Sequence, residues 1–192
     1  MKQANRVWVV DEDKSIRFVL EKALSRSGIS VDVFTNGESL LNELDSDSPD
    51  VVISDIRMPG IDGLAMLEKI VERPPKLPVI ITTAHSDLEN AVSSYQSGAF
   101  EYLPKPFDVD EAVALVRRAI KHREETQEGV PAAVEEEVTE IIGEAPAMQE
   151  VFRAIGRLSH SNVTVLINGQ SGTGKELVAR ALHRHSMRRE KN

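Results

Sequence analysis

Residues 51–60 read Val-Val-Ile-Ser-Asp-Ile-Arg-Met-Pro-Gly, and this stretch decides the fold. Residues 51–54 have strand character and end in Asp55, and residues 58–60 form a turn signal. A short apolar run that is bounded by a turn signal is typical of a strand buried inside a sheet. The carboxylate of Asp55 is therefore expected at the exposed C-terminal end of a strand.

Three other apolar runs also end in polar side chains that can take part in chemistry. They are the runs at 7–10, 79–82 and 102–103, which lead into Asp11-Glu12, Thr83 and Lys105. In a parallel α/β sheet the ligand crevice lies outside the carboxyl ends of the strands. These acids, the hydroxyl and the lysine are therefore expected to meet Asp55 at one edge of the sheet.

Short apolar strands alternate with amphipathic segments of helix length over residues 5–123, the pattern of a doubly wound parallel sheet. The expected strands lie near 6–10, 30–34, 51–54, 78–82 and 101–103. The expected helices lie near 14–27, 37–45, 63–72, 87–97 and 109–123. The sequence thus predicts an α/β fold with a five-stranded parallel sheet and right-handed crossovers.

This set of strand ends resembles the receiver domain of two-component response regulators, which has a flavodoxin-like fold. The segments at 54–60, 83–86 and 103–107 are most similar to the NtrC-type branch of that family. The resemblance covers residues 5–123 and implies that Asp55 is the phospho-acceptor. It also implies that Thr83 and Tyr102 form a switch pair and that Lys105 contacts the phosphoryl group. The implied Mg²⁺ ligands are Asp11, Glu12, Asp55 and the backbone carbonyl of Arg57.

The chemistry of phosphoryl transfer explains why these residue types occur together. A carboxylate and a phosphoryl donor are both negative, so a cation must offset the charge as they approach. Mg²⁺ suits this task because it takes oxygen ligands from one or two carboxylates, waters and phosphate. Each residue alone also has an ordinary structural interpretation, such as Asp55 capping a turn and Lys105 pairing with a carboxylate. Their joint order at successive strand ends favours the site.

Residues 124–140 form an acidic linker, with seven glutamates and no lysine or arginine. A second folded segment is expected over 141–192, beginning with a helix near 147–158 and a strand at 163–167. The strand leads into a phosphate loop, Gly169-Gln170-Ser171-Gly172-Thr173-Gly174-Lys175-Glu176. A glycine-rich loop between a strand and a helix is the context that a P-loop requires, because its backbone N–H groups and lysine hold nucleotide phosphates.

The general P-loop motif has Ser or Thr at the position of Glu176. Residues 141–192 resemble the AAA+ activators that work with sigma-N, many of which also have Glu at this position. The sequence ends at residue 192, before the later motifs of such an ATPase. We therefore expect an incomplete AAA+ α/β segment, with ATP binding by the complete domain and no ATP hydrolysis by this chain. The apolar residues of 147–158 and 163–167 are expected to be uncovered and poorly packed.

Composition excludes several classes of protein. The 192 residues contain no cysteine, which excludes disulfides and thiolate metal sites. The net charge of −8 argues against a nucleic-acid-binding surface over the whole chain. The sequence has no signal peptide and no apolar run of membrane-spanning length, so a cytoplasmic protein with no membrane contact is expected.

The resemblance implies a regulatory protein rather than an enzyme. A sensor histidine kinase would phosphorylate Asp55, and the phosphorylated chain would control sigma-N-dependent transcription of nitrogen assimilation genes with further copies of itself. Contacts with sigma-N RNA polymerase and DNA are expected only through regions that this sequence lacks. Two alternatives remain at this stage: a stand-alone phosphorelay protein or phosphate sink, and a small P-loop nucleotide-binding protein.

Overall fold

The structure is a computed structural model that describes residues 5–73, 76–84, 88–127, 146–158, 161, 163–170 and 172–187. Its strands are β1 (Arg6–Val10), β2 (Ser30–Phe34), β3 (Val51–Asp55), β4 (Val79–Thr83) and β5 (Glu101–Pro104). Its helices are α1 (Lys14–Arg26), α2 (Gly37–Glu43), α3 (Gly63–Val71), α4 (Leu88–Gln96), α5 (Val109–Gln127), α6 (Pro146–Leu158) and α7 (Lys175–His185). Strands and helices alternate up to α5, as the sequence predicts.

The five strands form one parallel sheet in the order β2-β1-β3-β4-β5. This confirms the predicted doubly wound α/β fold. The register aligns the carboxyl ends of the central strands, because Val10 pairs with Ser54 and Asp55 pairs with Thr82. The side chains that end β1, β3 and β4 therefore lie at one edge of the sheet.

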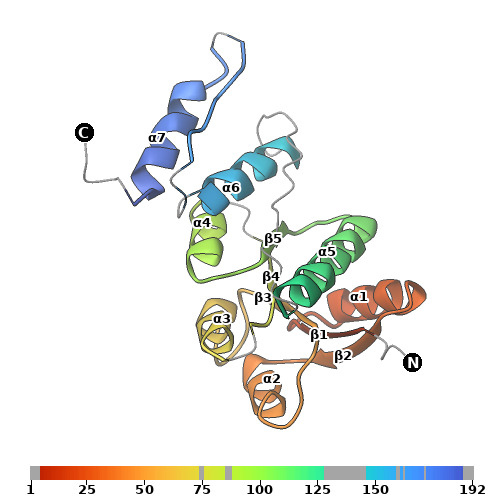
Figure 1. Ribbon diagram of the computed structural model, residues 1–192. Coiled ribbons are helices and arrows are strands. Elements are labelled where there is room, and N and C mark those ends of the chain that lie inside the picture. Colours follow the sequence, from red (N-terminus) through yellow and green to blue (C-terminus); the bar gives the residue numbers. More distant parts are fainter. Residues whose placement is uncertain are drawn as a thin grey trace.

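Helices cover both faces of the sheet, and each face has its own apolar core. Helices α1 and α5 lie over one face, and α2, α3 and α4 lie over the other (Figure 1). Alternate residues of β1 belong to the two cores. Val7 and Val9 lie in the core under α1 and α5, and Trp8 and Val10 lie in the core under α2, α3 and α4. This sorting follows from the two-residue period of a strand.

Side-chain caps set the first residue of three helices. Asp13, Asn36 and Asp62 each accept a hydrogen bond from a backbone N–H in the first turn of α1, α2 and α3. Such caps satisfy N–H groups that have no acceptor within the helix. The caps of α1 and α2 also begin these helices within a few residues of the preceding strands, which keeps those two connecting loops short.

Two predictions about the second segment are wrong. Residues 163–167 do not form a strand in the described part of the chain, and Leu166 is 82% exposed, because no neighbouring strand is present to pair with them. The helix at 147–158 is not left uncovered, since α6 packs against α4 of the receiver (Figure 1). Most of the predicted linker, from residue 128 onward, lies outside the described residues, and α5 extends into its first four residues.

None of the helices that the structure describes combines the length and the apolar composition needed to cross a membrane.

Candidate functional site

Lys105 joins the two acids that end β1 and β3. Its Nζ donates to Oδ2 of Asp11 at 2.7 Å and lies 3.0 Å from Oδ2 of Asp55. All three side chains are largely buried, with 14% of Lys105, 2% of Asp11 and 10% of Asp55 exposed. The structure therefore brings together three of the predicted site residues from three separate strands, as the rule for parallel sheets requires.

The loop that carries the acid pair is held in place by its own backbone. Oδ1 of Asp11 accepts from the N–H of Asp13 at 2.8 Å. The guanidinium of Arg17 donates to the carbonyls of Asp11 and Glu12 at 2.6 and 2.9 Å. These contacts leave Oδ2 of Asp11 directed to Lys105, whereas the side chain of Glu12 is exposed.

The two predicted switch residues lie on the neighbouring strands β4 and β5. Thr83 and Tyr102 are both buried, with 1% and 0% of their surface exposed. The backbone N–H of Lys105 donates to the carbonyl of Thr83 at 2.7 Å, which links the end of β4 to the loop after β5. The bond between Lys105 and Pro106 is cis, as the resemblance implies.

Burial and the neighbouring charges shift two of the site's pKa values upward. Burial raises the pKa of Asp55, and the hydrogen bond and charge of Lys105 offset part of that rise. Burial alone would lower the pKa of Lys105, but its contacts with Asp11 and Asp55 outweigh this effect and raise the pKa. Lys105 therefore remains a cation at neutral pH, and ionised Asp55 is stabilised less by its surroundings than a carboxylate in water.

The raised pKa of Asp55 predicts a pH-dependent loss of stability in the metal-free protein. Between the ordinary value of 3.8 and the higher folded value, the unfolded chain releases this proton while the folded chain keeps it. The contribution of Asp55 to the free energy of unfolding therefore falls as pH rises through this window. We expect the Asp55→Asn protein to lack this fall. The difference in free energy of unfolding between the two proteins, measured by urea unfolding, should therefore change with pH. A difference that does not change with pH would contradict this account.

The donor set suits an oxygen-preferring cation. Asp11 and Asp55 bring two carboxylates to one ammonium, so the site keeps a net negative charge before a phosphoryl group arrives. Mg²⁺ needs only one or two carboxylates together with waters and phosphate oxygens. Among the described residues, no three acidic or histidine side chains lie close enough together to hold a metal ion, so Glu12 does not complete a cluster with the other two.

The predicted phosphate loop leads directly into α7. Gly172 and Gly174 have positive φ angles of 84° and 79°, which glycine adopts without strain. Gly174 is the residue before the helix, and no side chain caps the first turn. Lys175 donates to the carbonyl of Gly169 at 2.7 Å and to the carbonyl of Gln170. Ser171 lies outside the described residues.

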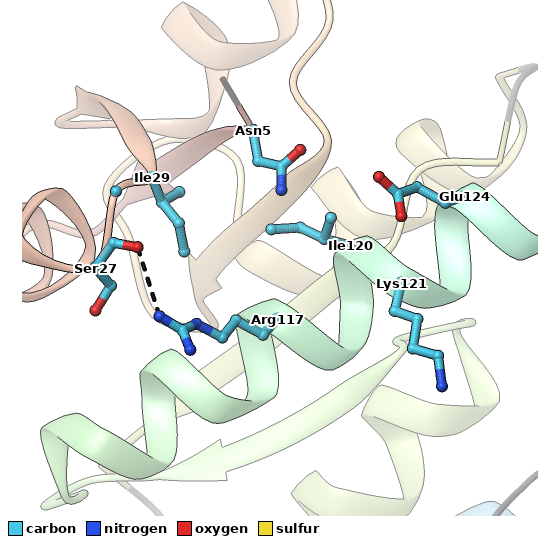
Figure 2. Close-up of a pocket in the computed structure, with 8 residues that line it drawn as sticks. Asn5, Ser27, Ile29, Arg117, Ile120, Lys121 and Glu124 are labelled. Carbon is cyan, nitrogen blue, oxygen red and sulfur yellow. Dashed lines mark hydrogen bonds between the residues drawn. The ribbon is translucent and has the colours of Figure 1, made fainter. Parts of the chain in front are cut away.

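A pocket of about 340 Å³ lies at the opposite end of the sheet (Figure 2). It is lined by Asn5, Ser27, Gly28, Ile29, Arg117, Ile120, Lys121 and Glu124. Asn5 and Ile29 immediately precede β1 and β2, so the pocket is next to the amino ends of these strands. It is therefore separate from the edge that carries Asp55.

Sequence reasoning missed two residues that shape the site. Arg17 holds the acid loop, and its signal is a basic residue one turn after the Asp13 cap. Gly63 allows α3 to start against the end of β3, since a Cβ there would lie 2.0 Å from the carbonyl oxygen of Asp55. A glycine that directly follows a capping aspartate was the available signal for Gly63.

Comparisons with known protein families match two separate parts of the chain. Residues 7–117 match the response regulator receiver domain, and residues 141–192 match the sigma-54 interaction domain. The DNA-binding transcriptional regulator NtrC of Escherichia coli strain K12 is 64% identical over 186 residues, which are 97% of this chain. NtrC of Bradyrhizobium sp. is 40% identical over 97% of the chain. The chain spans about 40% of the length of these curated relatives.

Solved structures of related proteins are also similar to this chain. The BeF3-activated receiver domain of nitrogen regulatory protein C is 64% identical, with a TM-score of 0.55 over 62% of this chain and 97% of that one. NtrX from Brucella abortus in complex with ATP is 32% identical, with a TM-score of 0.62 over 99% of this chain and 42% of that one. The chain belongs to the response regulator receiver family, as an NtrC-type response regulator that joins a receiver domain to the start of a sigma-54 interaction domain.

Proposed function

We propose that Asp55 accepts a phosphoryl group from a sensor histidine kinase and that this reaction controls sigma-54-dependent transcription. Sigma-54 is the factor also called sigma-N. The observation that carries the proposal is the junction of Asp11, Asp55 and Lys105, in which a buried ammonium lies 2.7 and 3.0 Å from two carboxylates. A structural ion pair needs one carboxylate, whereas the second leaves a net negative charge that a divalent cation can offset.

In the proposed transfer, an oxygen of Asp55 attacks the phosphorus of a phosphohistidine. The bond from phosphorus to the imidazole nitrogen breaks, and its electron pair leaves with the imidazole. The product is an acyl phosphate on Asp55, and no further reactant is consumed. Lys105 lies 3.0 Å from Asp55, so its ammonium can bind an oxygen of the transferred group.

The metal would be held by Asp11 and Asp55, with the carbonyl of Arg57 close in sequence to Asp55. Glu12 is exposed, so its carboxylate can turn toward the other two. When bound, Mg²⁺ neutralises charge that develops on the phosphoryl oxygens. Arg17 supports this arrangement by holding the backbone of Asp11 and Glu12.

Thr83 and Tyr102 would connect the phosphorylated site to the rest of the molecule. The hydroxyl of Thr83 would donate to a phosphoryl oxygen, and its movement would change the packing of Tyr102 on the adjacent strand. Thr83 pairs with Pro104 in the sheet register, two residues beyond Tyr102. A ligand that favours one of two packings shifts the population between them.

Nucleotide binding is proposed for the complete sigma-54 interaction domain. The loop at 169–176 has two glycines with positive φ and a helix start that lacks a side-chain cap, both of which suit phosphate. Leu166 and Leu177 are exposed on either side of it, with 82% and 71% of their surface accessible. Such apolar flanks need the remainder of the domain, and this disfavours a small stand-alone P-loop protein.

The proposed output follows from the relatives. They are called DNA-binding transcriptional regulators, and the chain matches about 40% of their length. We infer a cytoplasmic regulator of nitrogen assimilation genes that acts with further copies of itself, and that meets RNA polymerase and DNA through regions outside this sequence. The match to the response regulator receiver domain supports a histidine kinase as the partner.

The direct test is phosphorylation of the chain by acetyl phosphate. With Mg²⁺, intact mass is expected to show one phosphoryl group per chain, and peptide mapping should place it on Asp55. Chelation of the metal is expected to slow the reaction about a hundredfold, because charge stabilisation by a metal is worth several kcal/mol. A sodium salt at matched ionic strength serves as the control. Equal rates with and without chelator would contradict the metal's role, and an unmodified chain would overturn the proposed function.

A further inference from the structure

A residue of α2 binds the loop that connects β3 to α3. Oε1 of Glu38 accepts a hydrogen bond from the backbone N–H of Ile61 at 2.8 Å, although the two residues are 23 positions apart in the sequence. Glu38 lies in the first turn of α2, and Ile61 lies in the loop just before α3. Helices α2 and α3 contact each other (Figure 1). The hydrogen bond therefore ties the loop that follows Asp55 to a neighbouring helix.

Two glycines allow this close approach. A Cβ on Gly60 would overlap both carboxylate oxygens of Glu38 and would lie 2.9 Å from its carboxyl carbon. Gly60 also has a φ of 84°, a backbone conformation that glycine adopts without strain. A Cβ on Gly37, the first residue of α2, would lie 2.5 Å from Cγ2 of Ile61. The carboxylate therefore lies directly over the turn at Gly60, and the start of α2 packs on Ile61.

The other end of the loop is held by β4 and by the start of α3. The N–H of Ile56 donates to the carbonyl of Thr82 at 3.0 Å, and the N–H of Gly63 donates to the carbonyl of Ile56 at 2.8 Å. Arg57, whose carbonyl is the proposed backbone ligand of the metal, follows Ile56 directly. The segment that begins at Arg57 is thus held at both ends, and the contact with Glu38 holds the end farther from the strand.

We propose that Glu38 is a positioning residue for the metal site, because it fixes the loop that carries the carbonyl of Arg57. This inference rests on the proposed function of Asp55. A binding group that is held in advance costs less conformational entropy when its ligand binds. Outer-shell partners of metal ligands typically change metal affinity by about 10- to 100-fold. Glu38 acts through the loop and not on Arg57 directly, so the lower end of that range, about tenfold, is expected.

Hydrogen exchange of the Ile61 amide, followed by NMR, tests the contact in the metal-free protein. Glu38 is exposed, so it can be replaced without opening the core. Glu38→Ala should speed exchange of this amide by about tenfold, since a hydrogen bond to a charged acceptor is lost. Glu38→Gln keeps an oxygen that can accept the same bond and should restore most of the protection. The matched control is Glu43→Ala, which removes an exposed acid from the last residue of the same helix and should leave Ile61 unchanged.

Titration of the amide signals with Mg²⁺ then measures metal affinity in the absence of any phosphoryl donor. Glu38→Ala should weaken Mg²⁺ binding by about tenfold, and Glu38→Gln by about twofold or less. This pair separates positioning from electrostatics, because both variants remove the negative charge and the glutamine keeps the acceptor. In phosphorylation by acetyl phosphate, the Mg²⁺ concentration for half the maximal rate should rise by the same factors. The maximal rate at saturating Mg²⁺ should not change.

Gly60→Ala reaches the same contact from the other side. The added methyl group would overlap the carboxylate of Glu38, so that side chain must move away from Ile61. Gly60→Ala should therefore weaken Mg²⁺ binding about as much as Glu38→Ala does. Changes that act through one shared contact are not additive, so the double variant should lose much less than the roughly 100-fold expected of two independent tenfold changes. A full 100-fold loss would contradict a shared contact.

The outcomes distinguish this inference from the proposed function. Unchanged exchange of the Ile61 amide in Glu38→Ala would overturn the contact, and faster exchange with unchanged Mg²⁺ affinity would overturn its role in metal binding. A glutamine variant as weak as the alanine variant would show an effect of charge and would also overturn positioning. If metal binding responds as expected but Asp55 takes no phosphoryl group, the proposed function fails and the positioning role stands. Faster exchange with about tenfold weaker Mg²⁺ binding, both restored by glutamine, supports the inference.

Discussion

Replacing Asp55 with asparagine is expected to abolish phosphorylation of the chain by acetyl phosphate and Mg²⁺. The substitution keeps the shape of the side chain but removes the anionic oxygen that we propose attacks phosphorus and binds the cation. Both roles fall on one residue, which lies 3.0 Å from Lys105. The expected result is therefore loss of the added phosphoryl mass, not a modest decrease in rate.

The fold should survive Asp55→Asn. The carboxylate is buried and its pKa is raised by that burial, so a neutral amide removes a charge that the surroundings stabilise poorly. Asp62→Asn is the matched control. Asp62 is exposed at the start of α3 and accepts from the N–H of Ala65, a cap that asparagine also forms. It should leave phosphorylation and stability nearly unchanged.

A phosphoryl group that still adds to the Asp55→Asn protein at the original rate would contradict the assignment. Peptide mapping would then show whether Asp11 or Glu12 had accepted it. These two acids are the alternatives because they end the neighbouring strand, and Asp11 contacts the same lysine.

Gly63→Ala is expected to lower the free energy of unfolding of the receiver by about 3 kcal/mol. A Cβ at this position would lie 2.0 Å from the carbonyl oxygen of Asp55 and 2.9 Å from Cα of Ile56. Both neighbours are backbone atoms of a buried strand end, so neither can move as the tip of a side chain can. The clash must displace α3, β3 or both.

Helix propensity alone predicts that Gly63→Ala raises the free energy of unfolding, because alanine favours a helix over glycine by about 0.5–1 kcal/mol. Ala65→Gly in the same helix measures that propensity effect and should cost about 1 kcal/mol. Urea unfolding of the two variants and the original protein makes the comparison. If Gly63→Ala proves as stable as the original or more so, the close approach of α3 to β3 is wrong.

Gly63→Ala should also slow phosphorylation, because the displaced carbonyl belongs to Asp55, the proposed phospho-acceptor. The N–H of Gly63 donates to the carbonyl of Ile56 at 2.8 Å, so the turn after Asp55 is bound to the start of α3. A stability loss with an unchanged rate of phosphorylation would mean that α3, and not the end of β3, absorbs the clash.

Much of the receiver could be predicted because its signals are local. The run at 51–54 indicates a buried strand by its composition, and Asp55 indicates a site by following it. All five predicted strands and five helices of residues 5–123 form within a few residues of their expected bounds. The contact of Lys105 with Asp11 and Asp55 could be predicted as well, since parallel strands bring their carboxyl ends to one edge.

The second segment was predicted less well because its signals depend on missing partners. Residues 163–167 have the composition of a strand, but a strand forms only beside another one. The helix at 147–158 was expected to be uncovered, yet Ile155 is buried against α4. Its amphipathic pattern predicts an apolar side correctly and cannot say which surface covers it.

By itself, the sequence determined the order of strands and helices in the receiver, the acid at the end of β3 and the glycine-rich loop before α7. These follow from periodicity, turn signals and spacing, which act over a few residues. Only the tertiary structure decided that Glu101 joins Tyr95, Arg118 and Arg157, and that Gly63 lies against Asp55. Those contacts join residues on different elements, and their energies depend on burial and distance after packing, which no local pattern encodes.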